Sequence, residues 1–173
     1  MHRLRISRIS TRFVILASLL SAQSYALETD KSQDVQWSAD GNSVMSMRDG
    51  LRILEMSGNV QVTQGTLIIN GDDAVFERDA TTNELNKVTV HGSPVRYQQQ
   101  LDEEGGMVVG TSETLSFYTD QIDGETIVEL LGDASIQSPD STMKCKSITY
   151  LADQDLIKEA AGPCEGMLNS TSN

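Results

Sequence analysis

A strict alternation of apolar and polar residues, written more than once, is the feature that most constrains this chain. Residues 57–77 read SGNVQVTQGTLIINGDDAVFE, and residues 131–151 read LGDASIQSPDSTMKCKSITYL. The two segments align without a gap, so that Gly58 corresponds to Gly132. A period of two residues is typical of β-strands that have one dry face and one wet face. We therefore predict an all-β fold built from antiparallel strands.

A third, less regular copy lies between these two. Gly92 corresponds to Gly58 at an offset of 34 residues, and Phe117 corresponds to Phe76 at an offset of 41 residues. The difference places an insertion of seven residues in or beside the acidic loop at 101–106. Periods of this size predict a stacked repeat, in which each unit buries its apolar face against its neighbours.

The apolar side chains that share one phase form the candidate interior. In the middle copy the alignment points to Pro94 and Arg96, but Val95 and Tyr97 carry the apolar character, so its inward register stays open. A sealed sandwich core and an open ligand groove share the same binary pattern. A groove is favoured by the inward aromatic residues, the lack of a helix to cover the sheet, and the incomplete units at both ends. The candidate groove residues are Val35, Trp37, Val60, Val62, Leu67, Ile69, Ala74, Phe76, Val88, Val90, Val95, Tyr97, Leu115, Phe117, Leu130, Ile136, Met143, Ile148 and Tyr150.

The first 26 residues have the features of a cleaved secretory signal peptide. Four arginines precede a short apolar run, and Ser24-Tyr25-Ala26 supplies the small residues of a cleavage site after Ala26. The run is shorter than the ~20 residues of a membrane span, although a retained membrane anchor is the alternative. We expect an N-terminal segment at 27–34, one β domain at 35–162 and a short flexible tail at 163–173, all in the periplasm.

The net charge of the chain argues against partners whose surfaces carry many phosphate groups. The whole chain has a net charge of −12, and loss of the four signal arginines leaves nine basic against 25 acidic residues, or −16. Nucleic acid and anionic membrane surfaces are not expected as partners, because their phosphates are met by Lys and Arg.

The remaining motifs point to structure rather than catalysis. Cys145 and Cys164 are a candidate disulfide, because an even count is typical of an oxidising compartment; two unrelated small apolar residues are the alternative. Gly65, Gly92 and Gly132 are predicted to be turn glycines. The lone histidine of the mature chain has no nucleophile in its context, and the acidic loop lacks EF-hand spacing. We therefore expect no catalytic residue, no metal site and no cofactor.

Three segments together resemble the LptA/OstA-like family of periplasmic lipopolysaccharide-transport proteins. They are SGNVQVTQGTLIINGDDAVFE, HGSPVRYQQ and LGDASIQSPDSTMKCKSITYLADQDLIKEAAG, and the resemblance runs from about Val35 to Gly162. It implies an open-ended, twisted, V-shaped antiparallel β-jellyroll that holds lipopolysaccharide acyl chains between its sheets. It also implies head-to-tail assembly, and docking to an LptC-like inner-membrane protein and to the N-terminal domain of an LptD-like outer-membrane protein. The short tail after Gly162 departs from the family, and the cysteine pair is not carried over from it.

Unpaired edge strands are the expected joints, because an open edge invites pairing with another chain. The candidate assembly residues are Val35, Gln36 and Trp37 at the front and Leu156, Ile157 and Lys158 at the back. The acidic charge predicts that lipid A phosphates stay outside the groove, in water. The alternatives are a membrane-anchored LptC-like relative and a periplasmic enzyme on a β-repeat, which would need convergent acids on one strand face.

Overall fold

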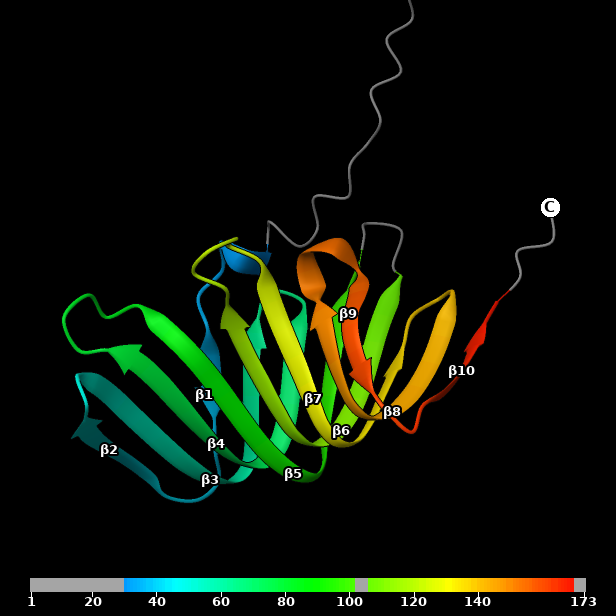
Figure 1. The fold of residues 1–173 in the computed structure, drawn as a ribbon. Coiled ribbons are helices and arrows are strands. Elements are labelled where there is room, and N and C mark those ends of the chain that lie inside the picture. Colours follow the sequence, from blue (N-terminus) through cyan, green and yellow to red (C-terminus); the bar gives the residue numbers. More distant parts are fainter. Residues whose placement is uncertain (1–29, 102–105, 170–173) are drawn as a thin grey trace, which may run out of the picture.

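The computed structural model describes residues 30–101 and 106–169, which form one ten-stranded antiparallel sheet (Figure 1). The expected signal peptide, the start of the segment at 27–34 and most of the acidic loop lie outside the described residues. The strand order is β1-β3-β4-β5-β6-β7-β8-β10, with β2 beside β3 and β9 beside β8. The predicted all-β class is confirmed.

Six long central strands carry most of the sheet, and short strands flank them. The central strands have 11 to 16 residues, about twice the usual length. The three sequence copies correspond to the hairpins β3–β4, β5–β6 and β7–β8. The elements are β1 (Gln36–Ser38), β2 (Ser43–Arg48), β3 (Leu51–Gln64), β4 (Leu67–Asp79), β5 (Leu85–Gln100), β6 (Met107–Thr119), β7 (Thr126–Gln137), β8 (Ser141–Leu151), the 3-10 turn η1 (Ala152–Gln154), β9 (Leu156–Ala161) and β10 (Glu165–Leu168).

Each central strand bends at an irregularity in its ladder. The register shifts across Ser57–Val60 in β3, His91–Val95 in β5 and Leu131–Ala134 in β7. Gly58 and Gly132 adopt φ values of +82° and +78° at two of these bends, a conformation that side-chain-bearing residues rarely take. Such β-bulges bend a strand without ending it.

These bends correct part of the sequence prediction. Gly65 does lie in a turn, between β3 and β4, with a φ of +59°. Gly92 and Gly132, which we expected in turns, lie instead inside β5 and β7. The repeat unit is therefore a pair of long bent strands, and not a series of short strands joined by glycine turns.

The bulge in β5 settles the register of the middle copy. From His91 to Val95, β5 advances by four residues while its partner β6 advances by two. From Ser57 to Val60, β3 advances by three residues while its partner β4 advances by two. One additional residue reverses which side chains face inward, because the side-chain period of a strand is two. Val95 and Tyr97 are accordingly buried.

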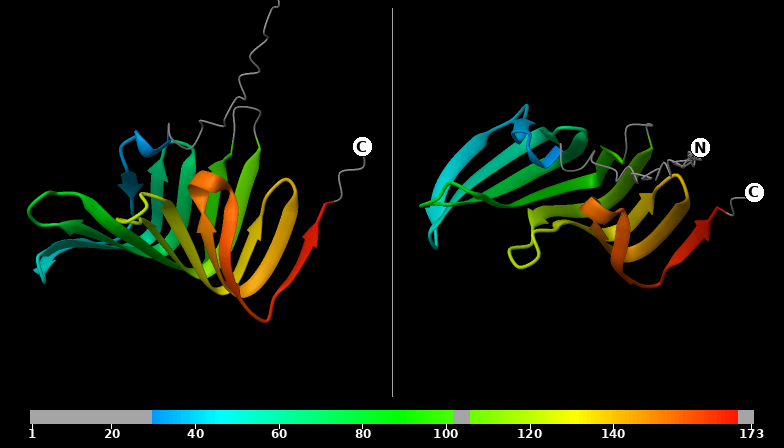
Figure 2. Two further views of the ribbon diagram at one scale, coloured as in Figure 1. Left: turned by 45° about the horizontal axis from the view of Figure 1, so that its top comes forward. Right: turned by 90° about the horizontal axis from the view of Figure 1, so that it is seen from above.

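The bends divide the sheet into two walls that face each other across an apolar interior (Figure 1). The first wall contains β2, β9 and the adjoining halves of the central strands, and the second wall contains β1, β10 and the other halves. Figure 2 shows the resulting trough from two further directions. Its two ends are formed by split pairs of short strands, β1 with β2 and β9 with β10.

The segment at 163–173, which we expected to be a flexible tail, contains a strand. β10 pairs with residues 141–144 of β8, on the second wall. It is the second half of the incomplete final unit: β9 runs along the first wall, and the chain crosses to the second wall at Gly162-Pro163. The alternation is too short there to reveal a strand of four residues.

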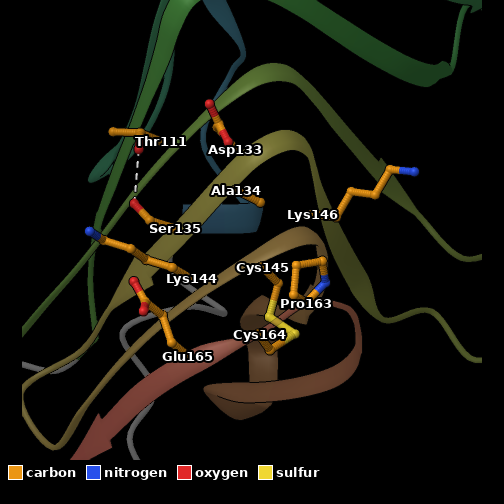
Figure 3. Close-up of a pocket in the computed structure, with 10 residues that line it drawn as sticks. All are labelled: Thr111, Asp133, Ala134, Ser135, Lys144, Cys145, Lys146, Pro163, Cys164 and Glu165. Carbon is orange, nitrogen blue, oxygen red and sulfur yellow. Dashed lines mark hydrogen bonds between the residues drawn. A yellow bond between two sulfur atoms is a disulfide. The ribbon is translucent and has the colours of Figure 1, made fainter.

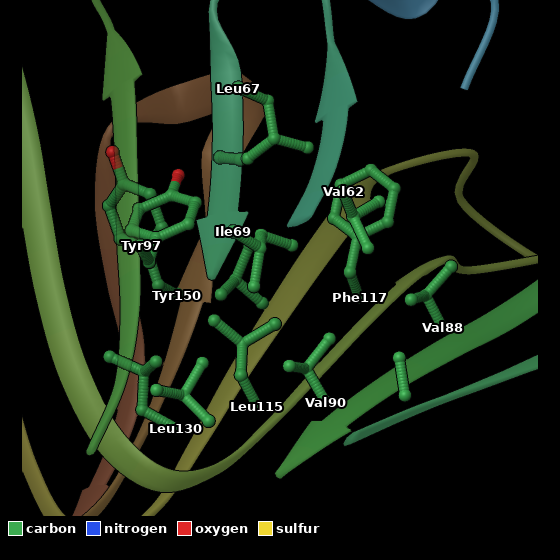
Figure 4. Packing of buried hydrophobic residues seen from close by; sticks show 14 of the residues in the cluster. Val62, Leu67, Ile69, Val88, Val90, Tyr97, Leu115, Phe117, Leu130 and Tyr150 are labelled. Carbon is green, nitrogen blue, oxygen red and sulfur yellow. The ribbon is translucent and has the colours of Figure 1, made fainter. Parts of the chain in front are cut away.

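Buried side chains of both walls meet in one cluster (Figure 4). Ile69, Val88, Val90 and Leu115 each have 0% of their surface exposed. The described residues include no helix with the length and apolar character of a bilayer span.

Candidate functional site

The interior between the walls contains almost all of the predicted groove residues. Sixteen of the nineteen are buried. Val35 and Met143 are partly buried against the same cluster, and Trp37 is 45% exposed because its strand is the last of the second wall. At its centre the interior is filled by its own side chains, so the walls are in contact there (Figure 4).

The predicted groove set leaves out six buried members of this cluster, which are Met56, Val108, Val128, Ala134, Cys145 and Ala152. Met56 is 3% exposed and Val108 is fully buried. Met56 precedes the first bend in β3, and its pairing with Ala74 places it on the inner face. Val108 lies between the apolar residues Met107 and Val109, so its neighbours do not reveal its phase, but its alternation with Gly110 and Ser112 on β6 was a usable signal.

A cavity of about 610 Å³ opens at the end of the trough formed by β1 and β2. We call it the N-terminal cavity. Trp37 lines it from the second wall, and Met45, Leu54 and Phe76 line it from the first wall. Met45 is 68% exposed because no strand follows β2. Apolar surface is therefore accessible to a ligand at this end of the trough, whereas at the centre it is covered by the facing wall.

A smaller cavity of about 240 Å³ lies at the opposite end. We call it the C-terminal cavity. Val108 and Ile136 line it from the second wall, and Tyr150 and Ile157 from the first. The Tyr150 hydroxyl donates a 2.7 Å hydrogen bond to the carboxylate of Asp155. The closed centre thus lies between two apolar openings.

A polar segment joins the open edges of the two walls, and we call residues 30–33 the strap. The Asp30 carboxylate, only 6% exposed, accepts hydrogen bonds from the Thr66 amide at 2.9 Å, the Thr66 hydroxyl at 2.6 Å and the Gln99 side-chain amide at 3.0 Å. Both partners belong to the second wall. The Lys31 ammonium contacts the Asp153 carboxylate at 2.5 Å and the Gly124 carbonyl at 3.2 Å, both on the first wall. The strap therefore fixes the spacing of the walls at this point.

Two tyrosines connect the strap to the interior. The Tyr97 hydroxyl donates a 2.8 Å hydrogen bond to Gln99, which in turn donates to Asp30. The Tyr97 and Tyr150 rings meet edge to face with centroids 6.5 Å apart. Burial raises the pKa of both phenols well above the ordinary value, so both remain neutral donors.

The candidate assembly edges are the outermost strands of the sheet. Gln36 and Trp37 lie on β1, directly after Val35, and Leu156 to Lys158 begin β9; each strand has one neighbour. Sequence reasoning missed the companion edges, β2 and β10. Both expose apolar side chains, including Met47 at 66% and Leu168 at 84%.

The two cysteines are bonded to each other. Cys145 lies at the bend of β8 and Cys164 just before β10, with their Cα atoms 4.3 Å apart (Figure 3). Ala134 and Cys145 are direct cross-strand partners, so the disulfide lies at the line where the walls meet. A cavity of about 690 Å³ beside it is lined by charged residues that include Lys144, Lys146 and Glu165.

Known proteins are similar to this chain in sequence. The family model described as "LptA/(LptD N-terminal domain) LPS transport protein" matches residues 38–155. The lipopolysaccharide export system protein LptA of Escherichia coli K12 is 29% identical over 158 residues, which cover 90% of this chain and 81% of that protein. The LptA of Haemophilus influenzae is 26% identical over 153 residues, covering 87% and 84%.

The fold is also found among solved structures. LptH of Pseudomonas aeruginosa, described as the LptA-homologous periplasmic component of a lipopolysaccharide transport device, aligns with a TM-score of 0.66 at 18% identity. The alignment covers 82% of this chain and 99% of LptH. Together with the bent two-walled sheet, the family match over most of the described residues shows that this chain belongs to the LptA/LptD N-terminal-domain family of LPS transport proteins.

Proposed function

We propose that this protein carries lipopolysaccharide across the periplasm by holding its acyl chains between the two walls. The observation that carries the proposal is the continuous apolar interior, which is contributed by every central strand and opens at both ends. The relatives named for lipopolysaccharide export support the ligand class. The signal-like N-terminus supports export to the periplasm.

Passage of an acyl chain requires the walls to separate locally. The side chains that would be parted are aliphatic or aromatic, such as Val90, Leu115 and Leu130, so no buried polar pair has to be broken at the centre. An inserted acyl chain replaces wall-to-wall contacts with wall-to-lipid contacts and keeps the same surface away from water. Each methylene transferred from water contributes about 0.8 kcal/mol.

We further propose that copies join head to tail through the split edges, β1 and β2 of one copy meeting β9 and β10 of the next. The same edges would receive an LptC-like inner-membrane protein and the N-terminal domain of an LptD-like outer-membrane protein. Backbone pairing across such a joint would continue the two walls and their interior from one protein to the next.

Photo-crosslinking in cells tests the lipid site. A photoreactive residue at Phe76 or Phe117, both on the inner face, is expected to crosslink to lipopolysaccharide. Thr89 is the matched control, because it lies between Val88 and Val90 with its side chain on the opposite face of β5. Equal labelling from Thr89, or none from either phenylalanine, would contradict a lipid site between the walls.

A pair of adjacent proline substitutions tests the joint. Successive residues of an antiparallel edge strand direct their N–H groups alternately toward β8 and away from it. Lys158 is an additional residue opposite β8, so the test uses Ala160 and Ala161, which pair regularly with Ile148 and Ser147. One of Ala160→Pro and Ala161→Pro should therefore remove an outward donor and abolish assembly, while the other weakens pairing with β8. Light scattering and thermal unfolding separate the two effects. Unchanged assembly of both variants would place the joint elsewhere.

A further inference from the structure

Two arginines face each other directly on the inner face of the first wall. Arg52 on β3 and Arg78 on β4 are cross-strand partners in the ladder. The next inner pairs along the same two strands are Leu54 with Phe76 and Met56 with Ala74. Like charges directly opposite each other destabilise a sheet, so this pairing lowers the stability of the fold.

Within residues 30–101 and 106–169, no carboxylate forms an ion pair with either arginine. The mature chain contains only nine basic residues against 25 acidic ones, yet the one ion pair found among the described residues joins Lys31 to Asp153. Two acids adjoin Arg78 in sequence. Asp79 uses its carboxylate to accept the amides of Thr81 and Thr82 at 2.7 Å each, and Glu77 forms no ion pair with a described residue.

Asn83 holds both guanidinium groups in place. Arg52 Nη1 donates to the Asn83 side-chain oxygen at 2.8 Å, and Arg78 Nε donates to the Asn83 carbonyl at 3.0 Å. Among the described residues, the two arginine side chains make no other hydrogen bonds. Each guanidinium has five N–H donors in a fixed fork, so most of the donors of the pair remain available.

The pair lies at the N-terminal cavity, whose other lining is largely apolar. Arg52, Arg78 and Asn83 line this cavity of about 610 Å³ together with Trp37, Met45 and Phe76. Asp34 also lines it, but forms no ion pair with either arginine. A cationic fork beside accessible apolar surface matches a ligand with an anionic head and hydrocarbon tails.

We propose that Arg52 and Arg78, positioned by Asn83, bind a phosphate monoester on the headgroup of an acylated glycolipid of the lipid A class, whose chains enter the N-terminal cavity. This inference rests on the proposed lipid-carrying function and adds a polar subsite to it. Phosphate is the favoured head because two guanidinium forks supply bidentate donors and the two positive charges that a doubly charged monoester needs. The net charge of the chain argues against phosphate binding in general, whereas this pair is a local exception.

The test compares two lipids that differ only in phosphate. Binding of phosphorylated lipid A and of its dephosphorylated form is measured on the mature protein, on Arg52→Gln/Arg78→Gln and on Arg52→Lys/Arg78→Lys. Arg96→Gln/Lys87→Gln is the matched control, because it removes the same charge from other strand positions. Inorganic phosphate is titrated in parallel, and circular dichroism checks the fold.

We expect the glutamine variant to bind phosphorylated lipid A 10- to 100-fold more weakly and the dephosphorylated lipid unchanged. The lysine variant, which keeps charge but lacks the forks, should lose less, and the control variant should lose under threefold. Inorganic phosphate should bind far more weakly than the lipid. Three results would overturn the subsite: equal affinity of the mature protein for both lipids, equal loss for both lipids in the glutamine variant, or inorganic phosphate binding as tightly as the lipid.

The subsite and the carrier function fail differently. If the mature protein binds both lipids equally well, the headgroup subsite is wrong and the carrier function stands. If it binds neither lipid, and Phe117 gives no crosslink, both proposals are wrong.

Discussion

The disulfide offers the sharpest quantitative test of how this sheet is held together. Cys145 and Cys164 are 19 positions apart, and the loop they close contains the end of β8, η1 and β9. Replacing both with alanine releases that loop in the unfolded chain. The chain-entropy relation for a loop of this length gives about 3 kcal/mol of lost stability.

This loss converts to a shift in melting temperature. An unfolding entropy of about 2.1 cal/mol/K per residue, over roughly 140 folded residues, amounts to about 0.3 kcal/mol/K. We therefore expect Cys145→Ala/Cys164→Ala to melt about 10 °C below the oxidised protein. β10 should lose amide protection first, because all four of its residues are exposed and it pairs only with β8.

Differential scanning calorimetry and hydrogen exchange measure the two effects. Reductant should shift the oxidised protein to the melting temperature of the alanine variant and leave that variant unaffected. The reasoning is refuted if the variant melts within 2 °C of the oxidised protein while β10 amides stay protected, since the bond would then restrain neither the unfolded chain nor the last strand.

Three further predictions concern the strap, the tyrosines and the N-terminus. Asp30→Asn replaces an acceptor oxygen with an amide donor that faces the amide donor of Gln99. Urea denaturation should therefore show a free energy of unfolding lower by about 2 kcal/mol, whereas the exposed control Asp34→Asn should change it little. Equal losses would mean that the strap is not specific. Burial raises the pKa of Tyr97 and Tyr150, so the contribution of the two neutral phenols to the free energy of unfolding should be fully present below pH ~10. Above that pH the unfolded chain loses protons that the native state keeps, and the free energy of unfolding should fall by about 2.7 kcal/mol per pH unit for the two groups together. Tyr150→Phe should halve this slope, and an unchanged slope would contradict this origin. Mass spectrometry of the exported protein should give a chain beginning at Leu27, and an intact N-terminus would favour a membrane-anchored relative.

The sequence by itself determined the strands, the inner face and the stacking of the units. Alternation fixes which side chains share a face, because successive residues of a strand point to opposite sides. Alternation alone therefore predicts that Val62, Ile69 and Leu115 face the interior, where the structure buries them. The gap-free match of two segments likewise determined that β3–β4 and β7–β8 are equivalent hairpins.

Only the tertiary structure decided what depends on a partner strand. A glycine with positive φ has the same local conformation in a turn and in a bulge, and Gly132 is a bulge because β6 and β8 continue past it. The register of Val95 was decided by one additional residue opposite β6. Arg52 and Arg78 are 26 positions apart and become neighbours only through the ladder. Local sequence encodes the faces of each strand, whereas the strand beside it decides where that strand bends and which charges meet.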